Sequence, residues 1–367
     1  MTMLARPLGF LLAGLIAAVL LAELVLRALP IPAGIAAADP VPGWPAHRLV
    51  PNSRFTSSSG WALENVQRGT INNAGYIAPF DYRDGAHVGV VIGDSFVEGY
   101  MNPYPTMLQA RLAHDLGLPA DQVYNFGSSG ASLPHYLGVA RLAGARYRPR
   151  WAVVLVTKGD VVEGFGSAPG FFRWDDGPDL IRIVPERRRG RMAKMARDLA
   201  VLRYARGNLK LSAATLFASG FASERATRCV PARLEAADRR LLARWLAALP
   251  TALSLPPQRV VLVFDGEHPA PVAAAAAPPP ACPDRDDVAR AWLRREADAA
   301  GIRTVATAPI FAAAVARDHR PIDRAPLDGH WNPHGHALVA HAVALALATR
   351  TPADRAHDQG SSSDASP

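Results

Sequence analysis

The architecture of this chain is clearest in one stretch, Val90-Val91-Ile92-Gly93-Asp94-Ser95-Phe96-Val97-Glu98-Gly99. An apolar run ends in Gly-Asp-Ser, and a glycine follows four residues after the serine. The run predicts a buried strand that delivers Ser95 into a tight turn at its C-terminal end. Ligands of wound α/β folds meet the sheet at that edge, so the serine is expected at a functional site.

Short valine-rich segments alternate with helical ones on the C-terminal side of this stretch. The expected strands are 88–92, 122–126, 151–157, 259–264 and 302–306, and the expected helices are 104–116, 133–145, 231–248, 285–300 and 334–348. The strands are short, apolar and rich in valine, as expected for sheets covered on both faces. The alternation predicts an α/β fold, a three-layer α/β/α sandwich around a flavodoxin-like parallel sheet of about five strands.

A second informative segment, Asp328-Gly329-His330-Trp331-Asn332, lies far downstream. A serine hydroxyl is barely acidic and needs an adjacent base before it can act as a nucleophile. His330 is the candidate base, and Asp328 can lie on the same side of an extended backbone and orient its ring. Two plainer interpretations stay open: Ser95 caps a helix, and His330 is an ordinary surface or core histidine.

These segments together resemble the SGNH (GDSL-type) hydrolases. The resemblance rests on Gly93-Asp94-Ser95, on Asn125-Phe126-Gly127-Ser128-Ser129-Gly130, and on Asp328 with His330, in the family's chain order over roughly residues 85 to 345. It implies that Ser95 is the nucleophile, His330 the base and Asp328 the acid. It also implies an oxyanion hole made by the backbone N–H groups of Ser95 and Gly130, and no cofactor.

The sequence departs from the family pattern in the third block, where an asparagine usually donates to the oxyanion. The strand expected at 151–157 is followed by Lys158-Gly159-Asp160, with Gly159 at the asparagine position. Losing one such donor typically costs about 100- to 1000-fold in rate. Three alternatives remain: Lys158 supplies positive charge, Asn125 or Asn332 reaches in, or catalysis is weak. Asp160 is expected to accept a hydrogen bond from the Ser95 turn.

The N-terminus carries a membrane signal. Arg6 precedes an apolar run from about Leu8 to Ala22, close to the roughly 20 residues that span a bilayer. The favoured interpretation is an uncleaved anchor over residues 1–29, with the N-terminus in the cytoplasm and the remaining chain in the periplasm. A cleavable signal peptide, cut after Ala36-Ala37-Ala38, is the alternative.

The remaining chain divides by composition. Residues 30–84, rich in proline and alanine at their start, are expected to be a periplasmic linker and lead-in, and 85–350 the hydrolase-like domain. The strand–helix pattern breaks over about 163–227, which predicts an insertion that caps the site. The basic run 187–191 within it is either a solvated face or a contact for anionic headgroups or acidic glycan. The polar residues 351–367 are expected to be disordered.

Composition limits other functions. Formal net charge is +8, carried almost wholly by arginine, yet export and the lack of any recognised motif argue against nucleic-acid binding. Cys229 and Cys282 are the only cysteines, and an even count in an exported chain permits one disulfide between them; the alternative is two unrelated small side chains. His334, His336 and His341 follow His330, but no carboxylate–histidine spacing indicates a metal site.

The sequence thus predicts a bacterial, membrane-anchored serine esterase or acyltransferase of the inner membrane. The resemblance places the acid of most members three residues before the histidine, which is Leu327 here, whereas Asp328 gives the shorter spacing of relatives that modify polysaccharides. The expected substrate is therefore a small ester or an O-acetylated glycan, and the expected partner is envelope polysaccharide machinery. The alternative is a catalytically inactive protein of this fold that binds glycan or assembles an envelope complex.

Overall fold

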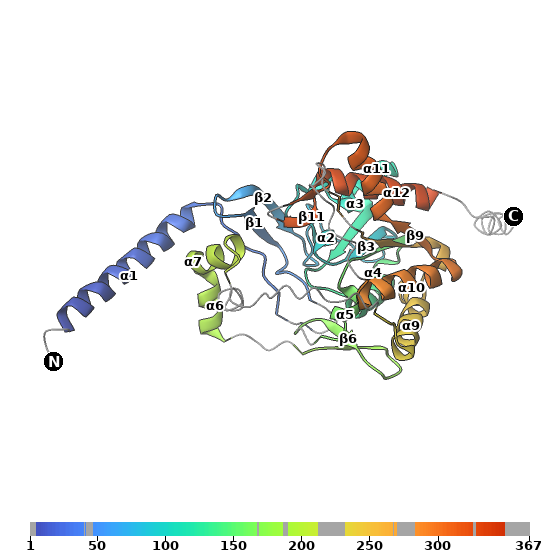
Figure 1. Ribbon diagram of the computed structural model, residues 1–367, viewed down its shortest axis with the longest axis horizontal. Helices are drawn as coiled ribbons and strands as arrows, with labels where there is room; N and C mark the ends of the chain where they lie inside the picture. The colour runs from blue at the N-terminus through green and yellow to red at the C-terminus, as the bar shows by residue number, and fades with distance from the viewer. Residues whose placement is uncertain are drawn as a thin grey trace.

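A computed structural model describes residues 5–39, 41, 47–166, 169–185, 190–211, 232–266, 268–269, 283–325 and 328–348. Its centre is a five-stranded sheet in the order β4-β3-β5-β8-β9 (Figure 1). The strands are β3 (Gly89–Gly93), β4 (Val123–Gly127), β5 (Trp151–Val156), β8 (Val260–Phe264) and β9 (Arg303–Ala306). Every neighbouring pair is parallel. The predicted α/β sandwich with a parallel sheet of this size is therefore confirmed.

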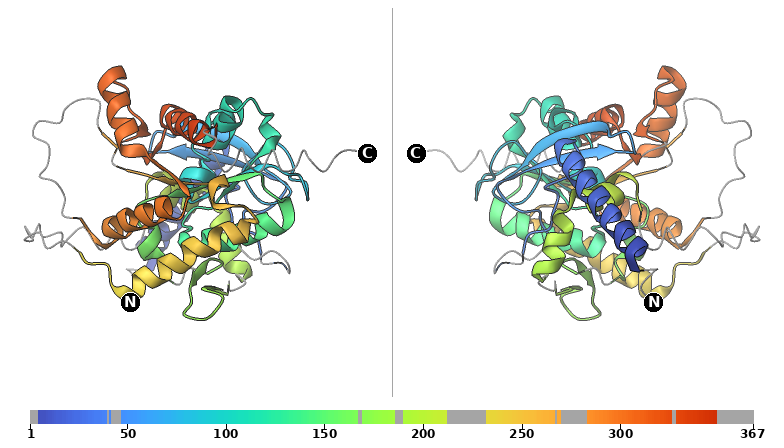
Figure 2. Two further views of the ribbon diagram at one scale, coloured as in Figure 1. Left: turned by 90° about the vertical axis from the view of Figure 1, so that its right-hand side faces the viewer. Right: turned by 90° about the vertical axis from the view of Figure 1, so that its left-hand side faces the viewer.

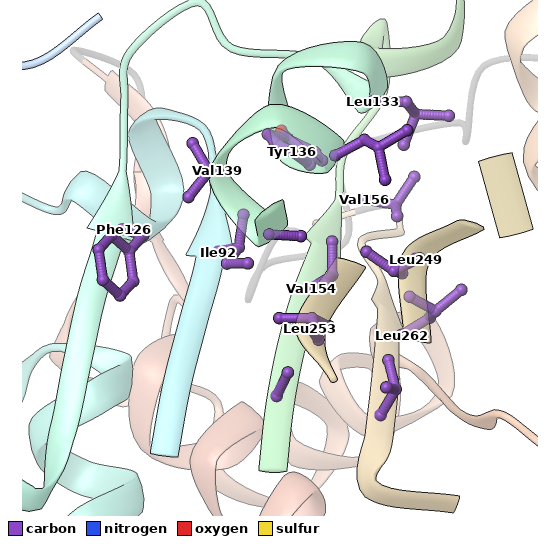
Figure 3. Close-up of a cluster of buried hydrophobic side chains, with 14 of the residues drawn as sticks. Ile92, Phe126, Leu133, Tyr136, Val139, Val154, Val156, Leu249, Leu253 and Leu262 are labelled. Carbon is purple, nitrogen blue, oxygen red and sulfur yellow. The ribbon is translucent and has the colours of Figure 1, made fainter. Parts of the chain in front are cut away.

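Helices cover both faces of the sheet, because the strands present apolar side chains alternately to each side. One face packs against α4 (Leu133–Tyr147), α9 (Ala236–Leu253) and α10 (Arg285–Ala299). The other packs against α3 (Leu108–Asp115), α11 (Thr307–Asp318) and α12 (Pro333–Ala348). Figure 3 shows part of the first core, where Leu133, Tyr136 and Val139 of α4 lie over side chains of neighbouring strands.

The helix predicted over 104–116 is interrupted. A short 3-10 helix (Tyr104–Thr106) precedes α3, and Met107 between them is extended, with φ −75° and ψ 157°. The helix α9 begins five residues after the predicted start at Pro231, and it continues through Pro250. Sequence patterns did not indicate α11, nor two further 3-10 turns at Ala120–Gln122 and Pro257–Arg259.

The expected linker over residues 30–84 is largely folded, and that expectation needs correction. Strands β1 (Ser53–Ser59) and β2 (Glu64–Ile71) form an antiparallel hairpin. Backbone bridges join Ala33 to Thr56 and Ala37 to Leu49. The hairpin buries its own small core, consisting of Leu49, Phe55, Ile71, Ile77 and Met107. Burial of these side chains keeps the segment against the body despite its proline content.

The insertion expected over 163–227 packs in two places. Its hairpin β6 (Phe172–Trp174) and β7 (Ile181–Ile183) lies on α4. The short helices α6 (Arg191–Asp198) and α7 (Ala200–Arg203) and a π turn (Tyr204–Asn208) lie beside α1 and β1 (Figure 1). Arg187–Arg189 of the basic run fall outside the described residues, as do residues 212–231 and the tail 351–367.

The N-terminal helix α1 (Ala5–Ala28) projects away from the body and is joined to it at its C-terminal end (Figure 1); Figure 2 shows the same helix viewed from two other sides. Its stretch Phe10–Ala28 has a mean hydropathy of 2.3 and is not buried. By length and composition it is able to cross a membrane, and an N-terminal signal sequence would meet the same test.

Candidate active site

The turn after β3 presents Ser95 at the first position of a short helix, α2 (Ser95–Glu98). Asp94 is the N-cap, and its carboxylate accepts a hydrogen bond from the Phe96 backbone N–H at 3.0 Å. Gly99 ends the helix in the left-handed region, with φ 65°. Because Asp94 satisfies the helix start, the capping interpretation of Ser95 does not apply, and the serine hydroxyl is left for other partners.

Three side chains converge beyond this turn. The short hairpin of β10 (Asp323–Arg324) and β11 (Asp328–Trp331) carries His330, whose Nε2 lies 2.7 Å from the Ser95 hydroxyl oxygen. The other ring nitrogen, Nδ1, makes a short hydrogen bond with Asp328, which also accepts the His330 backbone N–H at 3.1 Å. The structure therefore assembles Ser95, His330 and Asp328 in the order that nucleophile, base and orienting acid require.

The protonation of Asp328 agrees with this arrangement. Partial burial raises its pKa, but the hydrogen bonds and charge of His330 outweigh burial and hold the pKa below its ordinary value. The carboxylate is thus ionised at neutral pH. An ionised Asp328 fixes the proton on Nδ1 and leaves Nε2 free to accept the proton of the Ser95 hydroxyl.

Packing holds the histidine segment in place. The Phe96 ring lies 4.6 Å from the His330 ring, centroid to centroid. Trp331 is fully buried, and its indole N–H donates to Asp265 at 3.1 Å. Asn332 accepts the backbone N–H groups of His334 and Gly335 at the start of α12, and its amide donates to two carbonyls of the preceding loop.

The second sequence block lies against the nucleophile turn. The Ser128 N–H donates to the Gly93 carbonyl at 3.1 Å, and a Cβ at Gly127 would lie 2.0 Å from the Glu98 backbone nitrogen. Gly130 has φ 80° and faces open space. Neither the Ser95 nor the Gly130 backbone N–H donates to any residue that the structure describes, so both remain available to an oxyanion.

The side chains considered as replacements for the missing asparagine are bonded elsewhere. The Lys158 ammonium lies 3.1 Å from Asp284 and 3.6 Å from Asp287, so the geometry gives no support to Lys158 as an oxyanion donor. Asn125 donates to the Ile77 carbonyl and accepts the Gly127 N–H. Asn332 is occupied at α12. Of the expected donors, the backbone N–H groups of Ser95 and Gly130 are the ones without another partner among the described residues.

Asp160 is connected to the Ser95 turn through Thr157 and does not bond the turn directly. It begins α5 (Asp160–Glu163) and accepts hydrogen bonds from Tyr136 and from the Thr157 N–H, rather than from the Ser95 turn. The Thr157 hydroxyl in turn donates to Asp94 at 2.8 Å. Burial raises the pKa of Asp94 to about 6 and that of Asp160 well above its usual range. A chain of buried hydrogen bonds thus connects the end of β5 to Asp94, the N-cap of α2.

Sequence reasoning missed two groups near the site. Glu98 is 2 % exposed, makes a short hydrogen bond with the Ser129 hydroxyl, and burial raises its pKa to about 7. His268 lies between Asp265 (3.1 Å) and Asp323 (3.3 Å), at the base of the hairpin that carries His330. The only sequence signal for Glu98 was a charge inside an otherwise apolar four-residue turn.

The cysteines and the histidines that follow His330 add nothing to the candidate site. Cys229 and Cys282 both lie outside the described residues, so their disulfide stays a prediction. Among the residues that are described, no group of three or more histidine, cysteine or acidic side chains is arranged to hold a metal ion. His336 is buried beside α3, where its Nδ1 accepts the Leu108 N–H and burial lowers its pKa to about 3.

No protein-family model and no curated protein matches the chain. Nine chains of solved structures match it, at low identity. One is a protein of the G-D-S-L family from Desulfitobacterium hafniense DCB-2, 11% identical over 71% of this chain and 99% of that one, with a TM-score of 0.35. Another is LAE5, an α/β hydrolase from the metagenome of Lake Arreo, Spain (16% identity, 72% and 96% coverage, TM-score 0.36). A third is AlinE4, an SGNH-hydrolase family esterase (15% identity, 72% and 98% coverage, TM-score 0.29).

Proposed function

We propose that the protein is a membrane-anchored serine esterase or acyltransferase of the SGNH type. One observation carries the proposal: His330 Nε2 lies 2.7 Å from the Ser95 hydroxyl, with Asp328 hydrogen-bonded to the opposite ring nitrogen. Separate segments 235 residues apart in sequence bring these groups together at the carboxyl edge of the sheet. A helix-capping serine and an unrelated histidine would have no reason to meet in this geometry.

The geometry supports a two-step acyl transfer. His330 takes the Ser95 proton as the serine oxygen attacks the ester carbonyl, and the oxyanion meets the backbone N–H groups of Ser95 and Gly130. His330 then gives its proton to the departing alcohol, which leaves an acyl-serine. Water or a sugar hydroxyl, activated by the same ring, accepts the acyl group and restores Ser95.

The membrane part of the proposal rests on how α1 joins the body. The Glu23 carboxylate accepts the backbone N–H groups of Ala200 and Val201, both at 3.0 Å, and so caps α7. The candidate cleavage site is also engaged: the Ala38 N–H donates to the Arg48 carbonyl, and the Ala36 carbonyl accepts the Val50 N–H. Residues 23, 36 and 38, which cleavage would remove, are thus bonded to the body, and these contacts favour an uncleaved anchor in the inner membrane, with the catalytic domain in the periplasm.

The substrate class follows from analogy. The Asp328-x-His330 spacing resembles that of relatives that modify polysaccharides, and an anchored periplasmic domain would meet envelope glycans. We therefore propose an O-acetylated glycan as the substrate, with envelope polysaccharide machinery as the partner.

Labelling with a fluorophosphonate tests the catalytic proposal. The full chain in neutral detergent should gain one adduct on Ser95 by intact mass, and should hydrolyse a small acetyl ester. Ser95→Ala should abolish both signals, and His330→Ala should lose most of both. His114→Ala is the matched control, because the side chain of this histidine on α3 is 80 % exposed and its one partner among the described residues is the neighbouring Asp115. Equal labelling of the His330→Ala variant would contradict the proposal.

A second candidate function has its own observation in favour. Gly159, which follows β5, stands where related proteins have asparagine and has no side-chain amide to donate. The side chains of Lys158, Asn125 and Asn332 are bonded elsewhere. A hole with two backbone donors suits a protein that binds glycan or assembles an envelope complex without turnover. A folded wild-type chain that neither reacts with the probe nor hydrolyses any acetylated glycan would favour this function.

A further inference from the structure

A cavity of about 550 Å³ lies where α1 joins the body. Residues 32–36, directly after α1, line one side of it. The opposite side comes from α6, α7 and the π turn, and it carries three arginines, Arg197, Arg203 and Arg206, against one acid, Asp198. The cavity is far from Ser95 in sequence and belongs to a part of the insertion that the catalytic proposal does not use.

The arginines of this cavity are poorly satisfied within the protein. Arg203 donates one hydrogen bond to the Pro32 carbonyl at 3.2 Å, but its Nε is buried without a partner among the described residues. Arg197 and Arg206 make no side-chain hydrogen bond or ion pair with any residue in the described ranges. Guanidinium groups prefer carboxylate or phosphate oxygens, with which they form paired, charge-assisted hydrogen bonds.

The position of the cavity identifies the source of such an anion. The apolar stretch Phe10–Ala28 is interrupted near its end by the ion pair of Glu23 and Arg27, so the last turn of α1 belongs at headgroup level rather than in the hydrocarbon. The cavity begins four residues after this stretch ends at Ala28. The Glu23 cap on α7 holds the arginine-bearing elements beside the same end of α1 (Figure 1).

The helix α6 adds an independent sign of a lipid surface. Met192 and Met195 are 77 % and 64 % exposed, although most large apolar side chains of the body are buried. An exposed apolar pair on a helix that also carries basic residues is typical of helices lying in the membrane interface.

We propose that this cavity binds the phosphate group of an anionic phospholipid at the outer surface of the anchoring membrane. The arginines neutralise the headgroup, and α6 rests in the interface beside it. The inference rests on the anchor part of the proposed function and is independent of the chemistry at Ser95. Bound lipid would fix the height and orientation of the domain over the bilayer.

Lipid titration of the full chain in neutral detergent micelles tests this site. Dioctanoyl phosphatidylglycerol and dioctanoyl phosphatidylcholine are added separately, and bound lipid is counted by native mass spectrometry. We expect phosphatidylglycerol to bind more tightly, and the double variant Arg197→Gln/Arg206→Gln to weaken it by about tenfold or more, which corresponds to about 1.4 kcal/mol. These arginines have no described partner to lose, so the fold should persist.

The matched control is Arg239→Gln/Arg240→Gln, which removes the same charge from the exposed surface of α9. Equal weakening in the control, or equal affinity for the two lipids, would overturn the proposal. Inorganic phosphate distinguishes the sources of the anion: if it displaces the lipid at equal concentration, the cavity is a free-anion site instead. Fluorophosphonate labelling of Ser95 is measured in parallel, so a failure of the catalytic proposal is seen separately.

Discussion

At the residue scale, Asp328 decides which nitrogen of His330 carries the proton. Asp328→Asn should leave the fold intact but remove the charge that holds the proton on Nδ1. We expect turnover of an acetyl ester to fall by about 10³- to 10⁴-fold, as when the orienting acid of a triad is neutralised. Steady-state rates of purified variants measure this, and Asp115→Asn on α3 should be unaffected. A loss below tenfold would assign Asp328 a minor role.

A buried carboxyl next to the nucleophile turn predicts a pH effect on stability. Burial raises the pKa of Glu98 to about 7 in the folded protein, from an ordinary value of 4.5. Its contribution to the free energy of unfolding is therefore fully present below pH 4.5 and declines as pH rises through 7.

The variant Glu98→Gln isolates that effect. It cannot ionise, yet it still accepts the Ser129 hydroxyl. We expect urea unfolding to show a smaller loss of stability between pH 5 and pH 8 in the variant than in the wild type, with Asp94 and Asp160 supplying the remaining slope. Parallel curves for the two proteins would mean that Glu98 is already ionised when folded.

At the scale of elements, the approach of α2 to the end of β4 requires a glycine. A Cβ at residue 127 would meet the Glu98 backbone nitrogen at 2.0 Å, and backbone cannot move aside cheaply. Gly127→Ala should cost about 1–3 kcal/mol of stability and lower activity by displacing Ser95. Thermal unfolding and ester turnover report the two effects. Gly190→Ala, where nothing lies within 4 Å, should change neither.

The contact between α1 and α7 is a second test at this scale. Glu23→Ala removes both acceptors at the start of α7, which should cost about 0.5–2 kcal/mol locally. Hydrogen exchange of the full chain should show faster exchange over residues 200–208, with the central sheet unchanged. Glu64→Ala, on the exposed start of β2, is the control. Unchanged protection over 200–208 would mean that the cap is not formed.

The sequence predicted best those elements that are recognisable from the apolar pattern of their own residues. All five strands of the central sheet were located to within about a residue or two, because each is a short apolar run buried on both faces. The hairpin β1–β2 was missed, since its burial depends on Met107 and other residues distant in sequence. Proline-rich composition alone suggested a linker there.

At the scale of the whole molecule, sequence predicted which residues meet but not what surrounds them. Ser95, Asp328 and His330 were recognisable because each stands in a motif. The partners of Lys158 and Asp160 were not foreseen. Lys158 pairs with Asp284 and Asp287, which lie far away in sequence. Asp160 accepts the Thr157 N–H, and the Thr157 hydroxyl rather than Asp160 bonds the cap of the Ser95 turn. Such partners become visible only when the chain is folded.

The Glu23 cap has a consequence for motion. A domain on a flexible linker reorients freely and samples many distances from its membrane. A helix that is hydrogen-bonded to the domain through α7 instead holds the domain rigidly. In a bilayer such a helix would let the protein rotate about the membrane normal and diffuse laterally, but would restrict tilting of the domain and movement away from the membrane. The active site would then stay at a nearly constant height above the bilayer, and a polymer would have to come to that height to be modified.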